Sequence, residues 1–226
     1  MIIVSPARSI TKSSEFYLKL DFEILAYQNR HYAMSNGIKV ELNTDSFSRP
    51  GLRFLVKSYQ EAKDKLENYG PLYFSENEFI LSDPSGIRIY ISEKPDTADS
   101  KKPESNSILG NFAGVSIEST DMSKSLEFYT SLGFKTENGN PEAGWLSLKD
   151  SSGNSISIMK ANSCPHSFFN PSLTFFNSGK NLEVIDKIRQ VNIPIKEEVT
   201  VFNKEGIVDN VILQDPGGIG FFVFND

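Results

Sequence analysis

The sequence holds few of the side chains that build disulfides and transition-metal sites. It has one cysteine, Cys164, and two histidines, His31 and His166, among 226 residues. A lone cysteine cannot form an internal disulfide, and zinc and most other transition metals are held largely by histidine and cysteine. The composition therefore excludes an internal disulfide framework and disfavours a histidine-based metal centre. We interpret both histidines as surface or loop residues, and we assign Cys164 no nucleophilic role.

An excess of basic residues and a long apolar run are also missing. Lysine and arginine number 23 against 29 aspartates and glutamates, which gives a net charge of −6 and a pI near 5.1. Nucleic-acid binding needs a clustered basic surface, so no nucleic-acid partner is expected. No segment approaches the roughly 20 apolar residues that cross a bilayer, and MIIVSPARS turns polar too soon for a signal peptide. The sequence predicts a soluble, cytoplasmic monomer or homodimer with no membrane partner.

One phrase occurs twice in the chain. DPSGIRIYI at 83–91 returns as DPGGIGFFV at 215–223. Asp-Pro-x-Gly favours a tight turn, because proline presets one φ angle and glycine accepts a positive φ, and the apolar run that follows reads as a strand. Each copy therefore predicts a turn that leads into a strand ending near an aromatic residue, Tyr90 or Phe222.

A second pair of phrases indicates an internal duplication. SSEFYLKLDF at 13–22 matches SLEFYTSLGF at 125–134 with an offset of 112, whereas the closing phrases are offset by 132. The order is the same in both halves, with about 20 extra residues in the second. Between them lies KPDTADSKKPESNSILG at 94–110, whose polar composition is typical of a solvated linker. We predict domains at 1–94 and 111–226, joined by a mobile linker at 95–110.

Each half predicts two β-α-β-β-β units. In the first half, helices are expected within 9–20 and 58–70, with strands around them, and Asn36-Gly37 is a strong hairpin signal. The second half repeats the arrangement with helices expected at 123–132 and 182–191. The predicted fold class is α+β, with four βαβββ modules.

These four modules, with the phrases EFYxxLxF and DPxG, resemble the vicinal-oxygen-chelate superfamily of glyoxalases, extradiol dioxygenases, and bleomycin- and fosfomycin-resistance proteins. The resemblance covers nearly the whole chain apart from the linker. It implies that modules pair into two domains, in each of which the strands curl into a cup around a ligand. Metal-using members of that family place their ligands on the first and last strands of the units. The matching positions here are Ile2, Glu41, Gly51 and Tyr90 in the first half, and Gly114, Ser157, Ser172 and Phe222 in the second.

Those positions are poor in metal donors. Isoleucine, glycine and phenylalanine have no usable donor atom, and one carboxylate with one phenol does not complete a divalent-metal site. Tyr90 and Phe222 stand where the family's carboxylate would stand. We therefore expect no metal and no other cofactor.

The first cup is predicted to be polar and partly cationic. Residues two apart on a strand share a face, so Lys39 accompanies Glu41, Arg53 accompanies Gly51, and Arg88 accompanies Tyr90. Guanidinium groups bind carboxylates and stack on aromatic rings, so Arg53 and Arg88, with Lys39, Glu41 and Tyr90, are the candidate ligand-binding residues for an anionic or aromatic small molecule. The alternative is that Arg53 simply neutralises Glu41 inside the barrel.

The second cup is predicted to be more apolar, and filled by Phe176 and Phe222. Three functions stay open. The leading hypothesis is a metal-independent protein that binds a small molecule in the N-terminal cup, and drug sequestration of the resistance-protein kind falls within it. The second is a glyoxalase- or dioxygenase-type enzyme that uses Glu41 as a general base. The third is a protein-interaction module with filled cups.

Overall fold

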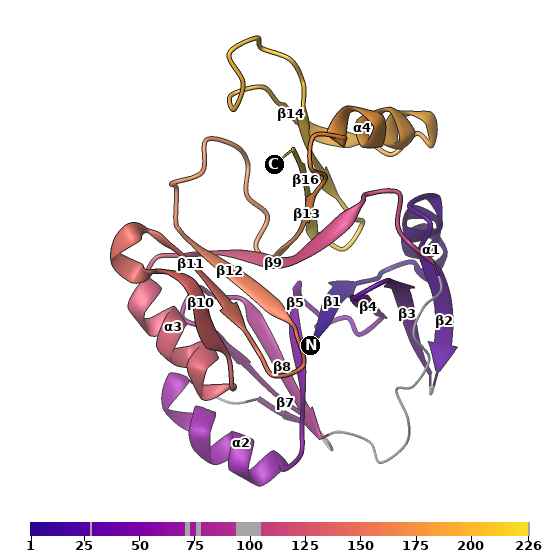
Figure 1. Cartoon of the computed structure of the whole chain (residues 1–226). Helices are drawn as coiled ribbons and strands as arrows, with labels where there is room; N and C mark the ends of the chain where they lie inside the picture. Colours follow the sequence, from indigo (N-terminus) through magenta and orange to yellow (C-terminus); the bar gives the residue numbers. More distant parts are fainter. Residues whose placement is uncertain (28, 71–72, 76–77, 94–104, 226) are drawn as a thin grey trace.

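The computed structural model describes residues 1–27, 29–70, 73–75, 78–93 and 105–225. They form two sheets, one from each half of the chain, with helices packed against them (Figure 1). The elements of the N-terminal half are β1 (Ile2–Pro6), α1 (Ile10–Lys19), β2 (Glu23–Tyr27), β3 (Arg30–Ser35), β4 (Ile38–Asn43), β5 (Gly51–Val56), α2 (Tyr59–Leu66), the 3₁₀ turn η1 (Glu67–Tyr69), β6 (Tyr73–Ser75), β7 (Glu78–Ser82) and β8 (Arg88–Glu93).

The C-terminal half repeats this plan. Its elements are β9 (Asn111–Ser119), α3 (Met122–Ser131), β10 (Lys135–Asn140), the 3₁₀ turn η2 (Pro141–Ala143), β11 (Trp145–Lys149), β12 (Ser155–Lys160), β13 (Ser172–Phe176), α4 (Asn181–Gln190), β14 (Ile195–Val199), β15 (Asn210–Gln214) and β16 (Gly220–Phe224).

The two sheets have the same strand order. The first runs β2-β3-β4-β1-β5-β8-β7-β6 and the second β10-β11-β12-β9-β13-β16-β15-β14. In each sheet two modules meet through their first strands, which pair antiparallel: Ile3 lies opposite Leu52 in one half and Val115 opposite Leu173 in the other. The predicted α+β fold of four βαβββ modules, paired two by two, is confirmed.

Three edge strands were not predicted from the sequence. They are β6, β10 and β14, each of which lies at or beside an end of its sheet. Every residue of β10, KTENGN, is exposed, so the strand carries no buried alternation that a sequence pattern could reveal. The backbone pairing with β11 holds it in place.

The halves share one hydrophobic core and are not independent modules on a tether. Phe16 of α1 lies with its ring centroid 5.6 Å from that of Phe221 in β16, so the first helix packs against the second sheet. In return, Phe134 packs edge-on against Phe54 of β5, and Phe128 of α3 against Tyr69. Figure 1 shows α3 (pink) beside α2 (purple) at this contact. A single buried cluster accordingly runs through both halves.

The expected linker is described only in part. Residues 94–104 lie outside the described residues, so the boundary placed there stays a prediction. Residues 105–110 are docked on the N-terminal half: the Asn36 N–H donates to the Ser105 carbonyl at 3.1 Å, and the Ser107 N–H donates to Ser35 Oγ at 2.8 Å. Leu109 is fully buried. The prediction of a solvated linker is wrong for residues 105–110, because Leu109 is part of the shared core.

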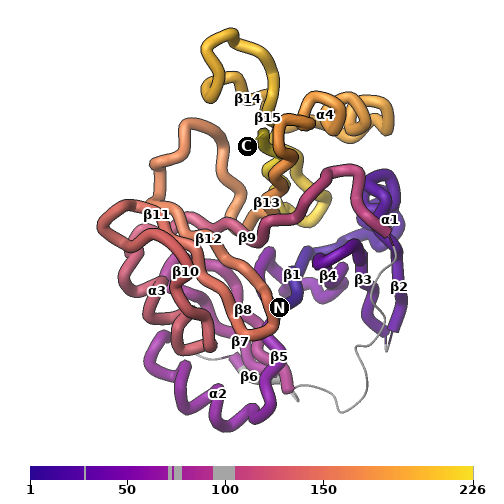
Figure 2. Tube along the Cα trace, in the orientation of Figure 1, coloured from indigo at the N-terminus to yellow at the C-terminus, as the bar shows by residue number. Residues whose placement is uncertain are grey.

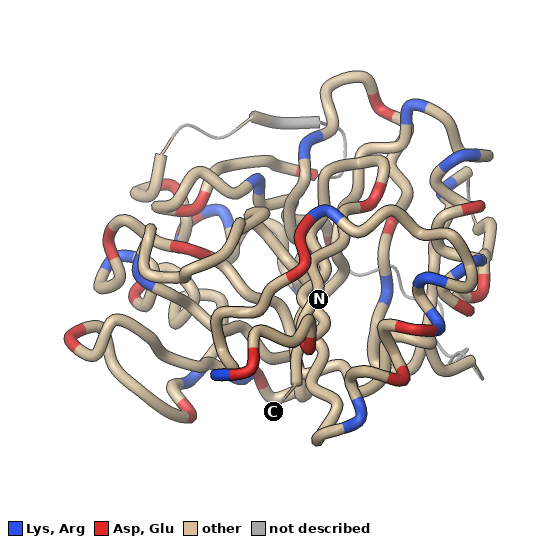
Figure 3. Tube along the Cα trace, turned by 90° about the horizontal axis from the view of Figure 1, so that it is seen from above, with Lys and Arg blue, Asp and Glu red and all other residues tan. Residues whose placement is uncertain are grey.

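Charges of both signs are interspersed along the chain (Figure 3). No helix in the described part of the chain is long and apolar enough to cross a membrane.

Candidate functional site

The N-terminal cup is built by alternation along its strands. Val40 and Leu42 of β4 face the core, which turns Glu41 to the opposite side of the sheet. On that side Tyr32 lies opposite Glu41 across β3 and β4, and Arg53 lies opposite Tyr90 across β5 and β8. Glu41, Arg53 and Tyr90 therefore lie in one cup.

Arg53 is the centre of this cup. Its Nε donates to Glu41 Oε2 at 2.7 Å and its Nη2 to Glu41 Oε1 at 3.3 Å, so the pair is bidentate. Its Nη1 donates to Ser92 Oγ at 2.6 Å and forms an ion pair with Glu78. Its guanidinium carbon lies 5.0 Å from the centroid of the Tyr90 ring. The Arg53 side chain is 1% exposed and the Glu41 side chain 2%, so the pair is held away from water.

This arrangement favours the alternative in which Arg53 neutralises a buried carboxylate. Burial lowers the pKa of Arg53, while the neighbouring Glu41 acts to raise it. A buried charge is tolerated only where partners satisfy it, and here Glu41, Glu78 and Ser92 do so. Both Glu41 oxygens are engaged, and Asn43 Nδ2 donates to Oε1 as well, at 3.2 Å.

The other two candidate residues lie apart from this centre. The Lys39 ammonium sits 4.5 Å from the centroid of the Tyr32 ring, and its side chain is half-buried. Arg88 lines a separate cavity of about 370 Å³, which it shares with Arg49 and with Asn170 of the C-terminal half. The Tyr90 hydroxyl is also engaged, because it accepts from the Arg49 N–H at 2.9 Å and donates to the Arg49 carbonyl at 3.0 Å.

Three residues of the cup were missed in the sequence. Ser92 follows Tyr90 by two positions, so the same alternation that placed Tyr90 could have placed it. Glu78 pairs with Ser92 across β7 and β8, a register that only the structure supplies. Arg30 lies 3.6 Å from Glu41 and is 44% exposed, which puts a second cation toward solvent.

The C-terminal cup is filled by aromatic side chains. Phe222 is buried and packs with Ile212 and Val199. Phe176 does not fill the cup, because it is 39% exposed. The side chains that pack against Phe222 come instead from the loop that joins β12 to β13 (Figure 2). From that loop Phe168 lies 4.8 Å, and His166 5.2 Å, between ring centroids from Phe222. The prediction of a filled second cup therefore holds for Phe222 and was wrong for Phe176.

The residues at the family's ligand positions do not fit a metal ion. Gly51 and Gly114 have no side-chain donor, and Glu41, the one carboxylate among those positions, is held by Arg53. Across the described ranges, no three His, Cys, Asp or Glu side chains converge closely enough to hold an ion.

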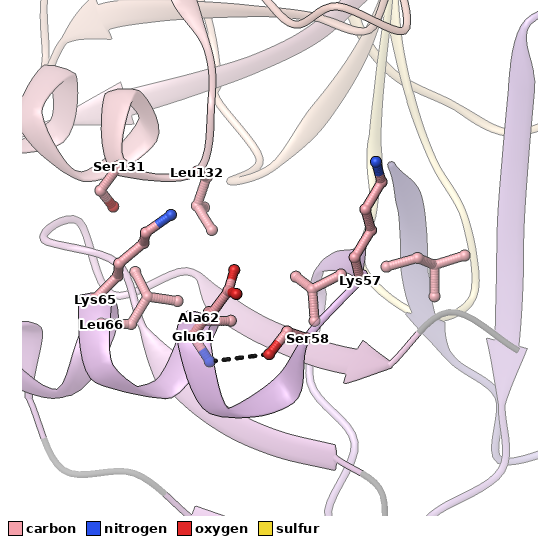
Figure 4. Close-up of a pocket in the computed structure, with 10 residues that line it drawn as sticks. Lys57, Ser58, Glu61, Ala62, Lys65, Leu66, Ser131 and Leu132 are labelled. Atoms are coloured by element: carbon pink, nitrogen blue, oxygen red, sulfur yellow. Dashed lines mark hydrogen bonds between the residues drawn. The ribbon is translucent and has the colours of Figure 1, made fainter.

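A smaller cavity of about 260 Å³ lies between the two halves, away from both cups. It is bounded by the end of β5, by α2 and by the end of α3, and Lys65 and Glu61 point from α2 toward it (Figure 4). Its lining carries both signs of charge, with Lys57 and Lys65 against Glu61.

No known protein-family profile matches the chain, and no curated protein matches it. Solved structures do. Homoprotocatechuate 2,3-dioxygenase from Arthrobacter globiformis superposes on all of this chain and 78% of its own, with a TM-score of 0.58 at 14% identity. This is the vicinal-oxygen-chelate fold. A Mn(II)-bound glyoxalase from Novosphingobium aromaticivorans matches 99% of this chain and 80% of its own, with a TM-score of 0.56 at 15% identity.

The 2,3-dioxygenase LapB from Pseudomonas sp. KL28 matches all of this chain and 91% of its own, with a TM-score of 0.56 at 13% identity. At identities this low the superpositions establish the fold alone, and the chemistry has to be argued from the residues of the site. The resemblance stated from the sequence is confirmed at the level of the fold.

Proposed function

We propose that this protein is a metal-independent member of the fold that binds a small anionic or aromatic molecule. The observation that carries the proposal is the Arg53 guanidinium, which lies between Glu41 and Glu78 in the N-terminal cup. A guanidinium carries a permanent positive charge and a planar fork of donors, so it supplies the cation that two cup carboxylates require. A divalent ion bound to Glu41 would have to displace it.

The enzyme alternative with Glu41 as general base gains no support from this geometry. A base must take a proton from its substrate, so one carboxylate oxygen has to be open to that substrate. Both Glu41 oxygens accept hydrogen bonds from Arg53, and one accepts a further bond from Asn43. Proton transfer to Glu41 would require the buried ion pair to open.

The ligand would meet the solvent side of the cup. Arg30 and Lys39 carry positive charge there, with Lys39 over the ring of Tyr32 and Arg30 at 3.6 Å from Glu41, whereas Arg53 is buried. Cations beside an aromatic ring suit an aromatic carboxylate, because the ring stacks and the carboxylate pairs with a cation. The residues we propose for contact are therefore Arg30, Tyr32 and Lys39, with Arg88, Tyr90, Glu41 and Arg53 behind them or at the rim. A cytoplasmic location is part of the proposal, which the lone cysteine supports.

The test is a thermal-shift titration with benzoate and 4-hydroxybenzoate in EDTA, at constant ionic strength. A ligand of the folded state raises the melting temperature. We expect the aromatic acids to raise the melting temperature of wild type, and to raise that of Lys39→Gln by less. The control Lys135→Gln, at an exposed lysine on β10, should show the same increase as wild type. The absence of any increase, or an increase only after Mn(II) or Fe(II) is added, contradicts the proposal.

The third alternative, a protein-interaction module, is favoured by one observation. The C-terminal cup is filled, and the loop between β14 and β15 exposes Val201, Phe202 and Ile207 beside it, each about half-exposed. If the aromatic acids fail to bind while Phe202→Ser changes the sedimentation of the protein, this alternative replaces the leading one.

A further inference from the structure

A large groove lies outside both cups. It has a volume of about 980 Å³ and is formed by the segment that leads into α1, the loop 44–50 between β4 and β5, and the turn at Pro216 and Gly217. It therefore joins elements of both halves. Its volume is at the upper end for small-molecule sites.

Positive charge predominates in this groove. Arg8, Lys12 and Arg49 line it, against the single acid Asp45. Asp45 is engaged by its own loop, since its Oδ1 accepts from the Phe47 N–H at 2.8 Å. The groove thus has two positive charges in excess.

Helix α1 begins at the same place. Ser9 caps it by accepting from the Lys12 N–H, and the ten-residue helix has no acidic residue in its first turn. The start of a helix carries partial positive charge from its unpaired N–H groups, which favours anions there. At the matching end of α3 the cap is an acid, Asp121, and it pairs with Lys124 at 3.2 Å.

A buried hydroxyl without a partner also lines the groove. Ser48 is 5% exposed, and within the described ranges its Oγ is the one buried side-chain polar atom that has no hydrogen-bond partner. Leaving such a group unpaired costs about 1–3 kcal/mol, so an unpaired hydroxyl in a native fold calls for an explanation. A ligand oxygen in the groove would accept its hydrogen bond.

From this geometry we propose that the groove binds the phosphate group of a phosphorylated small molecule. A phosphate offers several acceptor oxygens and a double negative charge, which fits two arginines, a lysine, a hydroxyl donor and a helix N-terminus. The groove is far larger than inorganic phosphate, so the ligand carries an organic portion. None of the residues proposed to contact a ligand in the cup lines this groove, although the Arg49 backbone is hydrogen-bonded to Tyr90 of the cup.

The experiment is isothermal titration with inorganic phosphate and with phenyl phosphate, at constant ionic strength because salt screens exposed charges. We expect saturable binding of both, with phenyl phosphate the tighter. Arg8→Gln with Lys12→Gln should weaken binding by about tenfold or more, as the loss of a charged hydrogen bond does. The matched control is Lys124→Gln, which removes the counterpart of Lys12 in the second half and should leave binding within about twofold.

Ser48→Ala provides the second readout. It should weaken phosphate binding, while the melting temperature of the ligand-free protein stays the same or rises because an unsatisfied hydroxyl is gone. No heat with either phosphate, equal affinities for the double variant and the Lys124→Gln control, or a ligand-free Ser48→Ala protein that melts lower than wild type would each overturn the proposal.

Discussion

The Tyr17 hydroxyl donates a hydrogen bond to Asp215 Oδ2 at 2.8 Å across 198 positions of sequence. Tyr129 makes the reciprocal bond, to Asp83 Oδ2 at 2.9 Å. The two tyrosines belong to the repeated helix phrase and the two aspartates to the repeated closing phrase. The helix phrase of each half therefore bonds to the closing phrase of the other half. The repetition thus has a structural role at the interface between the halves.

Each of these aspartates also organises its own turn. Asp83 Oδ1 accepts from the Ser85 and Ile87 N–H groups, and Asp215 Oδ1 accepts from the Gly217 and Ile219 N–H groups. The second oxygen of each aspartate accepts from the tyrosine, and in Asp215 it also accepts from Ser5 Oγ. Burial and the neighbouring aspartates hold the pKa of Tyr17 and Tyr129 well above the ordinary value, so both remain donors.

Tyr17→Phe should destabilise the whole protein. The substitution keeps the ring but leaves the buried Asp215 without one donor, which costs about 1–3 kcal/mol. Urea denaturation should show a lower midpoint with one cooperative transition, because the halves share a core. Tyr27→Phe, at a half-exposed position, is the control and should change stability by less than about 0.5 kcal/mol. Equal stability of the two variants would remove the interface role of Tyr17.

The two buried aspartates predict a pH dependence. Burial raises the pKa of Asp83 and of Asp215, although the hydrogen bonds that they accept act in the opposite direction. A carboxyl whose pKa is higher in the folded state stabilises the fold below its unfolded pKa, about 3.9, and this contribution is lost as pH rises through the folded pKa.

The stability of wild type relative to Asp83→Asn with Asp215→Asn should therefore fall as pH rises from about 4 to about 7. Denaturation curves of both proteins at several pH values measure this difference. A wild-type advantage that does not change with pH, or that grows with pH, would contradict this; growth would show that the accepted hydrogen bonds outweigh burial and lower the pKa of these carboxyls in the fold.

Arg53 and Arg88 should respond differently to removal. Arg53→Ala leaves Glu41 and Glu78 without their buried cation, and breaking such a pair costs about 3–5 kcal/mol. Arg88 is half-buried at the edge of a cavity, so Arg88→Ala should change stability by less than about 1 kcal/mol. Thermal melts compare the two directly. A small effect of Arg53→Ala would mean that Arg53 is not structural and would return it to the list of free ligand-binding groups.

Cleavage of the chain should not separate the halves. The polar stretch 94–104 is the expected site of first proteolysis, since exposed polar segments are nicked most readily. Residues 105–110 are docked, so cuts after Ser105 should come later. The two fragments should then co-elute in size-exclusion chromatography because they share one core. Fragments that elute separately would show that the interface of Tyr17 and Tyr129 is weak.

The sequence predicted the modules because their apolar strands alternate and their phrases repeat. The resemblance to the vicinal-oxygen-chelate superfamily implied cup positions for Glu41, Gly51 and Tyr90, and alternation along the strand then put Arg53 on the same face as Gly51. The sequence could not decide between a free and a paired Arg53, because the partners Glu78 and Ser92 reach it through the pairing of β7 and β8.

Other features were hidden for related reasons. The edge strand β10 has no buried face, and the filling of the C-terminal cup depends on how one loop folds back. The reciprocal hydrogen bonds, from Tyr17 to Asp215 and from Tyr129 to Asp83, join residues far apart in the chain. A single sequence carries no signal for such a pairing.

The central claim is that a paired arginine takes the place of a metal in the cup. Elemental analysis of the purified protein, after incubation with Mn(II), Fe(II) and Zn(II) and then dialysis, tests it most directly. The account predicts well below one equivalent of any divalent metal per chain, and the same value for Glu41→Gln. About one equivalent of a divalent metal that survives dialysis in wild type and is lost in Glu41→Gln would contradict it.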